Sequence, residues 1–275
     1  MTGNTVTFGS RWSSVLAESG QLCVGVDPHP SLLQSWGLPD SAAGVREFGL
    51  RTVDAVVGRA GVLKPQVAFF ERYGSAGYAA LESVLALARS AGLFVIADCK
   101  RGDIGSTVEA YGEAWLSPGS ALEADAMTAV AYQGLGSLRG VLDLAERYEK
   151  GVIVVTAASN PEAAATQGAI RADGRTVAAA LVDDIRNLPG TGGVVLGATV
   201  DLASYGITSE GLTGVPILAP GFGAQGTSLS QLPALFGAVS PQVMASSSRE
   251  ILGAGPRGIA AAIERAQAEL RGVTA

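Results

Sequence analysis

The sequence predicts a (β/α)8 barrel, and three observations support that fold class. Eight short apolar runs recur along the 275 residues, amphipathic segments rich in alanine and leucine separate them, and polar residues follow the ends of most runs. Strand-like runs that alternate with helix-like segments are typical of βα units in a parallel sheet. Eight such units fit the usual size of a closed barrel, about 250 residues.

The predicted strands are the apolar runs themselves. In chain order they are LCVGV (22–26), VLK (62–64), LFVIA (93–97), ADAMTAV (124–130), VIVVT (152–156), VVLGAT (194–199), VPILAP (215–220) and VMAS (243–246). The clearest helical segments are GYAALESVLALARSAG, SLRGVLDLAERYEKG, RTVAAALVDDIRNLPG and RGIAAAIERAQAELRG. Each of these segments closes on glycine, which is common where a helix ends.

The first 20 residues contain RWSSVLAES, which predicts an extra helix across the bottom of the barrel. No linker or change of composition divides the rest, so residues 1–275 are interpreted as one barrel domain. A doubly wound open sheet is the alternative. It would favour a G-x-G-x-x-G fingerprint after the first strand, where this chain has GVDPHP.

Composition excludes several classes of protein. Hydrophobic residues make up 48% and charged residues 16%, which predicts a large core. The net charge is −6 and no basic block occurs, so we expect no nucleic-acid partner.

The N-terminus lacks a secretory signal and no apolar run is long enough to span a membrane, so we expect a cytoplasmic protein. Cys23 and Cys99 lie in or beside apolar runs and are predicted to be buried thiols. With His29 as the single histidine, the chain offers little for a zinc site.

The run DCKRGDIGST, directly after the third predicted strand, is the first candidate for chemistry. Asp98 and Lys100 are two residues apart in a strand and should share a face, while Asp103 follows Gly102, where the chain can turn. Lys64 ends the second strand and should lie beside Asp98. Lys64, Asp98, Lys100 and Asp103 are then expected to form an array of alternating charges. Two plainer interpretations stay open, a structural salt-bridge cluster and a solvated lysine at the strand end.

A second candidate site lies after the seventh and eighth strands. The loop PGFGAQGTS runs from Pro220 to Ser228, and ASSSREILGAG follows the last strand. Barrels often bind phosphate at these two loops. Beside the backbone amides of these loops, the side-chain amide of Gln225 and the guanidinium of Arg249 are the predicted phosphate ligands. The plainer interpretation is a pair of glycine-rich turns with a surface arginine.

Two further positions remain ambiguous on the residues alone. Ser159 and Asn160, after the fifth strand, suit either the amide edge of a heterocycle or an N-cap before Pro161, and a cap is the simpler interpretation. Asp27 can bind a sugar hydroxyl or cap a turn. His29 is interpreted as a loop residue, not a base.

Taken together, these motifs resemble orotidine 5′-phosphate decarboxylases, in particular the bacterial type 2 branch. DCKRGDIGST is similar to the family's D-x-K-x-x-D-I-x-x-T signature. GVDP, LKPQVAFFERYG, SNP, APGFGAQG and SSSRE fall in the family's order over nearly the whole chain. The resemblance implies decarboxylation of orotidine 5′-monophosphate to UMP, the last step of de novo UMP synthesis, with no metal or organic cofactor.

The resemblance also implies roles for individual residues. Lys100 would protonate C6, Asp98 would face the substrate carboxylate, and Lys64 would link Asp98 to Asp27 and the ribose. Asp103, Ile104 and Thr107 would complete the neighbouring site in a homodimer. Three further kinds of substrate contact are implied. Ser159 would meet the pyrimidine edge, Pro220 would contact the substrate, and the phosphate would be held by Gln225, Arg249 and the backbone near Ser248.

One segment departs from the family pattern. The type 2 branch reads close to TVNPYLG after the fourth strand, where this chain has TAVAYQG from Thr128 to Gly134. We therefore assign no substrate contact there. Two rival functions remain, a magnesium-dependent sugar-phosphate lyase or synthase of the same superfamily and a catalytically silent nucleotide-binding barrel. Lys64 favours the decarboxylase over the first, because those relatives tend to have an acidic residue at that position.

Overall fold

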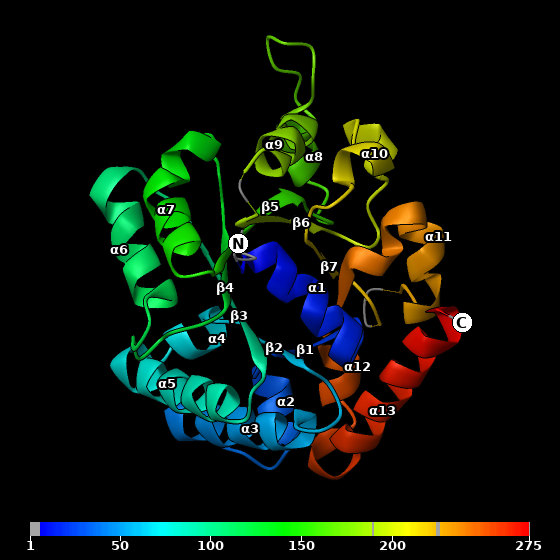
Figure 1. Ribbon diagram of the computed structural model, residues 1–275. Coiled ribbons are helices and arrows are strands. Elements are labelled where there is room, and N and C mark those ends of the chain that lie inside the picture. The colour runs from blue at the N-terminus through cyan, green and yellow to red at the C-terminus, as the bar shows by residue number, and fades with distance from the viewer. Residues whose placement is uncertain (1–5, 189, 224–225, 275) are drawn as a thin grey trace, which may run out of the picture.

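A computed structural model of the chain shows a closed parallel barrel (Figure 1). It describes residues 6–188, 190–223 and 226–274. The strands pair in sequence order, and β8 closes on β1. They are β1 (Leu22–Val26), β2 (Val62–Pro65), β3 (Phe94–Arg101), β4 (Ala126–Ala129), β5 (Gly151–Ala157), β6 (Gly192–Leu196), β7 (Ile217–Pro220) and β8 (Val243–Ser247). The predicted barrel is confirmed, and the alternative of an open sheet is wrong.

Helices surround the barrel as an outer ring (Figure 1). The longer helices are α3 (Ala42–Val56), α5 (Gly74–Ser90), α6 (Gly105–Leu116), α7 (Arg139–Arg147), α9 (Val177–Arg186) and α13 (Gly255–Thr274). The shorter ones are α2 (Pro30–Ser35), α4 (Ala68–Glu71), α8 (Ala163–Gln167), α10 (Ser209–Leu212), α11 (Leu232–Phe236) and α12 (Arg249–Leu252). Short 3-10 helices are η1 (Leu135–Leu138), η2 (Leu202–Tyr205), η3 (Leu229–Gln231) and η4 (Gly237–Gln242). Among the residues described, none of these helices is both long and apolar enough to cross a membrane.

The helix α1 (Phe8–Ser19) precedes the first strand and lies across one end of the barrel (Figure 1). Thr7 and Ser10 form a capping box that fixes where the helix begins. Phe8 and Trp12 are fully buried and belong to a core cluster with residues inside the barrel such as Cys23 and Phe94. The helix therefore closes the end at which the strands begin, and leaves the other end for function.

The observed strands agree with the predicted runs except at their ends. β1 has the predicted bounds, but β6 begins at Gly192 and ends at Leu196 where 194–199 was predicted. Gly192 and Gly193 pair with Val152 and Ile153 of β5, so the ladder includes two glycines that an apolar pattern overlooks. Cys23 and Cys99 are buried and free, as predicted. Burial raises the pKa of each thiol to about 12.

Candidate active site

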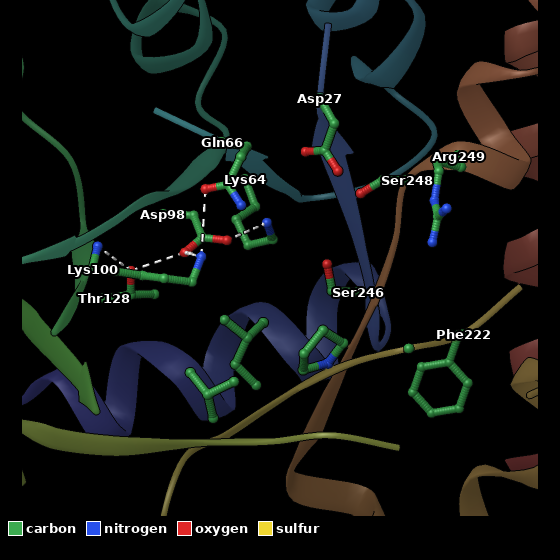
Figure 2. Close-up of a pocket in the computed structure, with 14 residues that line it drawn as sticks. Asp27, Lys64, Gln66, Asp98, Lys100, Thr128, Phe222, Ser246, Ser248 and Arg249 are labelled. Carbon is green, nitrogen blue, oxygen red and sulfur yellow. Dashed lines mark hydrogen bonds and ion pairs between the residues drawn. The ribbon is translucent and has the colours of Figure 1, made fainter. Parts of the chain in front are cut away.

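A cavity opens at the carboxyl ends of the strands, opposite α1 (Figure 2). Its walls come from loops and strand ends that lie far apart in the sequence, as expected for the functional face of a barrel. The lining residues are Asp27, Lys64, Gln66, Asp98, Lys100, Thr128, Val195, Leu218, Pro220, Gly221, Phe222, Ser246, Ser248 and Arg249.

Two lysines share one carboxylate on one side of this cavity (Figure 2). Lys64 Nζ lies 2.8 Å from Asp98 Oδ2, and Lys100 Nζ lies 2.6 Å from Asp98 Oδ1. Lys64 and Asp98 are buried, whereas the Lys100 side chain is 46% exposed and lines the cavity. The predicted placement of all three is confirmed, and the interpretation of Lys64 as a solvated lysine is wrong. The exposed ammonium of Lys100 is the part of the cluster that a ligand can reach.

The cluster keeps its two buried members charged. Burial alone would raise the pKa of Asp98, but the ammonium groups of Lys64 and Lys100 hold it well below its usual value. Burial alone would lower the pKa of Lys64, but the carboxylates of Asp98 and Asp27 raise it above its usual value. A carboxylate and an ammonium therefore stand fixed in the cavity wall at neutral pH.

The backbone of Lys100 is strained. Its φ of 46° places it in the left-handed region, which costs a non-glycine residue about 1–3 kcal/mol. The β3–β4 register shifts between Ala97 and Arg101, so β3 bulges at Lys100. Gly102 follows at a close approach, because a Cβ atom there would lie 2.2 Å from the Val130 backbone oxygen. The glycine of the KRGD sequence therefore lets the chain after the bulge pack against the residue that follows β4.

Thr128 and Gln66 hold Lys100 and Asp98 from either side, and sequence reasoning gave neither a role. Thr128 Oγ1 donates to Asp98 Oδ1 at 2.9 Å and accepts from the Lys100 backbone N–H at 2.9 Å. Lys100 Nζ lies 3.5 Å from Gln66 Oε1. With the Gln66 amide turned so that its nitrogen faces the Asp98 backbone oxygen, that nitrogen donates to it at 2.7 Å and the amide oxygen accepts from Lys100 Nζ at 3.2 Å. A threonine inside the apolar run ADAMTAV was the available signal at Thr128. Gln66 stands two residues after Lys64, in the segment LKPQVAFFERYG, whose only signal in the sequence is its resemblance to the family.

Asp27, Ser248 and Arg249 line another side of the cavity (Figure 2). Asp27 Oδ1 is buried without a hydrogen-bond partner in the described part of the chain, so it is available to a ligand hydroxyl. The cap near this turn is His29, whose Nδ1 accepts from the Ser31 N–H, so the alternative of a capping Asp27 is wrong. Gly25 makes room for Ser248, because a Cβ atom on Gly25 would lie 1.8 Å from Ser248 Oγ.

The seventh loop also reaches this part of the cavity. Pro220 lines it as predicted, together with Gly221 and Phe222, which the sequence did not single out. Ser246 on β8 and the apolar Val195 and Leu218 were also missed, because buried strand residues carry no polar strand-end signal. Gln225 lies outside the described residues, so its contact with phosphate stays a prediction.

Four predicted residues lie outside the cavity walls. Ser159 is exposed and lies beside Gly197. The helix α8 begins only at Ala163, and its N-cap residue, Glu162, makes no side-chain cap. The N-cap interpretation of Ser159 and Asn160 is therefore wrong. Asp103 accepts a hydrogen bond from the Ile104 N–H at 2.8 Å and is not among the lining residues, so it does not join the array within its own chain. Ile104, which is 60% exposed, and Thr107 face outward at the start of α6.

Among the residues that the structure describes, no three His, Cys, Asp or Glu side chains are grouped to hold a metal ion. The cavity offers instead ammonium groups, a guanidinium, hydroxyls and one unpartnered carboxylate oxygen. This set of groups can bind an anionic ligand that carries hydroxyls and can present an ammonium to one atom of it.

Comparisons with known proteins agree over nearly the full chain. The model described as "Orotidine 5'-phosphate decarboxylase / HUMPS family" matches residues 20–266. An orotidine 5′-phosphate decarboxylase of Salinispora tropica is 47% identical over 275 residues, covering 96% of this chain and 97% of that protein. One of Streptomyces coelicolor is 46% identical over 256 residues, covering 90% and 91%.

Solved structures give the same result. A crystal structure from Streptomyces avermitilis is 44% identical, has a TM-score of 0.92 and is matched over 98% of this chain and 97% of that one. The Leishmania donovani OMP decarboxylase is 29% identical with a TM-score of 0.78, over 97% and 98%. Because the family model and these relatives span almost the whole sequence, the chain belongs to the orotidine 5'-phosphate decarboxylase / HUMPS family.

Proposed function

We propose that this protein decarboxylates orotidine 5′-monophosphate to UMP and carbon dioxide in pyrimidine biosynthesis. The observation that carries the proposal is the cluster of Lys64, Asp98 and Lys100, in which one ammonium faces an open cavity. The relatives named orotidine 5′-phosphate decarboxylase support the same activity.

In the proposed mechanism Lys100 is the proton donor. The bond between C6 and the carboxylate carbon breaks, its electron pair stays on C6, and carbon dioxide leaves. The Lys100 ammonium then gives a proton to C6, which forms the C–H bond of UMP and leaves a neutral amine. A fixed ammonium stabilises negative charge as it develops on that carbon, and needs no reorganisation during the reaction. Asp98 faces the departing carboxylate and holds both lysines in place.

The rest of the nucleotide binds on the side of the cavity formed by Asp27, Ser248 and Arg249. Asp27 Oδ1 accepts from a ribose hydroxyl, with Lys64 between Asp27 and Asp98. Arg249 and the loop from Pro220 bind the phosphate, because a guanidinium forms paired hydrogen bonds with phosphate oxygens. The phosphate is remote from C6, so its binding energy can align the base and close loops over it. Ser159 would reach the pyrimidine only when the loop after β5 moves over the cavity.

We further propose a homodimer with shared sites. The outward-facing Asp103, Ile104 and Thr107 at the start of α6 support this arrangement, since an exposed isoleucine beside a carboxylate suits a subunit contact. In a mixture of Lys100→Ala and Asp103→Ala chains, each heterodimer would hold one intact site and recover activity. Absence of recovery, with heterodimers shown by native mass spectrometry, would contradict the shared site. We place the enzyme in the cytoplasm, where the free Cys23 and Cys99 stay reduced.

The test of the reaction is a spectrophotometric assay with orotidine 5′-monophosphate, with and without a chelator. Turnover that is unchanged by the chelator is the expected result. A strict magnesium requirement would favour the sugar-phosphate lyase or synthase. Binding of UMP without turnover would favour the silent barrel.

A further inference from the structure

The hydroxyl of Thr128 joins the backbone of Lys100 to the side chain of Asp98. Thr128 is fully buried in the middle of β4, and its Oγ1 makes two hydrogen bonds of 2.9 Å. It accepts from the Lys100 N–H and donates to Asp98 Oδ1, the same oxygen that lies 2.6 Å from Lys100 Nζ. The backbone N–H and the side-chain ammonium of Lys100 are therefore linked through Thr128 Oγ1 and Asp98 Oδ1. Figure 2 shows Thr128 beside Lys100 and Asp98.

The bulge in β3 explains why this hydroxyl is needed. Between Ala97, which pairs with Met127, and Arg101, which pairs with Ala129, three residues of β3 stand opposite the single residue Thr128. The Lys100 N–H is thus displaced from the regular ladder, and a buried N–H needs an acceptor. Thr128 Oγ1 supplies that acceptor while φ of Lys100 is 46°.

We propose that Thr128 is a positioning residue for decarboxylation, whose hydroxyl holds the left-handed Lys100 backbone and the Asp98 carboxylate in one fixed arrangement. This inference rests on the proposed function, since it assumes that Lys100 is the proton donor. Without the hydroxyl, the Lys100 N–H loses its acceptor, Asp98 Oδ1 loses a donor, and the ammonium shifts relative to C6. A displacement of about 1 Å costs roughly 100-fold in rate.

A second buried threonine provides the matched control. Thr156 is also fully buried, on the neighbouring strand β5, but its Oγ1 donates to Val154 O of its own strand at 2.9 Å. It is not among the residues that line the cavity. Thr→Val at either position removes a buried hydroxyl and keeps the shape, so the pair separates a local loss of stability from a loss of positioning.

The experiment measures kcat and KM for orotidine 5′-monophosphate, UMP affinity by calorimetry and Tm for the wild type, Thr128→Val, Thr128→Ser and Thr156→Val. We expect Thr128→Val to lower kcat by about 10- to 100-fold, with KM and the UMP Kd within about threefold of wild type. Thr128→Ser, which keeps the hydroxyl, should restore kcat to within about threefold. Thr156→Val should keep the wild-type kcat even if its Tm falls.

Three outcomes would overturn the inference. They are an unchanged kcat in Thr128→Val, an equal loss in Thr128→Ser, or an equal loss in Thr156→Val. If Thr128→Val does not fold, Thr128→Ala takes its place, and equal kcat values for Thr128→Ala and Thr128→Ser would refute the role of the hydroxyl. Failure of the wild type itself to decarboxylate the substrate is a separate result, which would reject the proposed function.

Discussion

The two ends of the barrel hold similar charged residues in opposite arrangements. At the end covered by α1, Arg11 pairs with Asp125, and Lys150 Nζ lies 3.0 Å from Glu123 and 3.7 Å from Asp125. The other oxygen of Asp125 accepts from the Val95 N–H at 2.8 Å. Opposite charges thus neutralise one another beneath the α1 helix, next to the packed rings of Phe8, Trp12 and Phe94.

At the open end the charged groups are not fully paired with one another. Two ammonium groups share the single carboxylate of Asp98, Asp27 Oδ1 has no partner among the described residues, and Lys100 has a strained backbone. Such features cost stability unless a ligand completes them. The comparison teaches that the same residue types stabilise the fold where they are covered and matched, and prepare a binding site where they are open and unmatched.

The largest expected effect at the open end is that of Lys100→Ala. The substitution removes the proposed proton donor and the cation proposed to face C6, so kcat should fall by about 1,000-fold or more. UMP affinity should change little, because Arg249 and Asp27 remain. Steady-state kinetics and UMP calorimetry measure the two effects, and Lys100→Arg, which keeps a cation but loses a ready proton donor, is the control. Near-wild-type turnover in Lys100→Ala would reject the mechanism.

At the end covered by α1, Trp12→Ala should lower stability and leave kcat unchanged, the opposite of what is expected for Lys100→Ala. Trp12 is 1% exposed, stacks edge-on against Phe94 and donates to the Gln242 backbone oxygen at 3.0 Å. Its loss should lower the free energy of unfolding by about 3–5 kcal/mol, measured by urea denaturation. The kcat per folded molecule should stay at the wild-type value, and Trp12→Phe should recover part of the stability. A large fall in kcat without loss of stability would mean that the two ends are coupled.

The positions of the strands and of the main charged residues could be predicted from the sequence, but the contacts that hold those residues could not. Apolar runs located the strands, because burial of a parallel strand on both faces requires them. The pairing of Lys64 with Asp98 also followed, since the two strands are neighbours. Lys100 reaches Asp98 as the two-residue repeat predicts, although β3 bulges at that point. The roles of Thr128 and Gln66 did not follow, because they depend on a bulge and a left-handed residue that no periodicity reveals. Ser159 was assigned to the pyrimidine through the resemblance, and the loop that carries it lies away from the cavity walls.

A smaller effect is expected at the proposed phosphate site of the open end. Arg249→Ala should raise KM by about 10- to 100-fold, the value of one or two charge-assisted hydrogen bonds. The effect on kcat should be smaller, because the proposed binding mode places the phosphate, and with it Arg249, away from C6. Arg257→Ala, on α13 and not among the lining residues, is the control. Equal KM values for Arg249→Ala and the wild type would remove Arg249 from the phosphate site.

The smallest expected effect is the change in stability of Glu123→Gln, at the end of the barrel that α1 covers. Burial raises the pKa of Glu123, but the Gly119 N–H and the Lys150 ammonium together hold it below the usual value. Because the folded pKa is below the unfolded value of about 4.3, this carboxylate adds stability above that pH and loses it as the pH falls through the folded pKa. Glu123→Gln should therefore lower the free energy of unfolding by about 0.5–1 kcal/mol at pH 7, and by less at about pH 3.

Urea unfolding at the two pH values measures this difference for Glu123→Gln. The exposed pair of Arg59 and Glu264 gives the control, because Glu264→Gln at a solvent-exposed ion pair should change stability little. Turnover should be unchanged in both variants, since neither residue reaches the cavity. A stability difference that grows toward acid pH would show that the pKa of Glu123 is raised by folding. The charges beneath α1 would then destabilise the fold, and the contrast between the two ends of the barrel would fail.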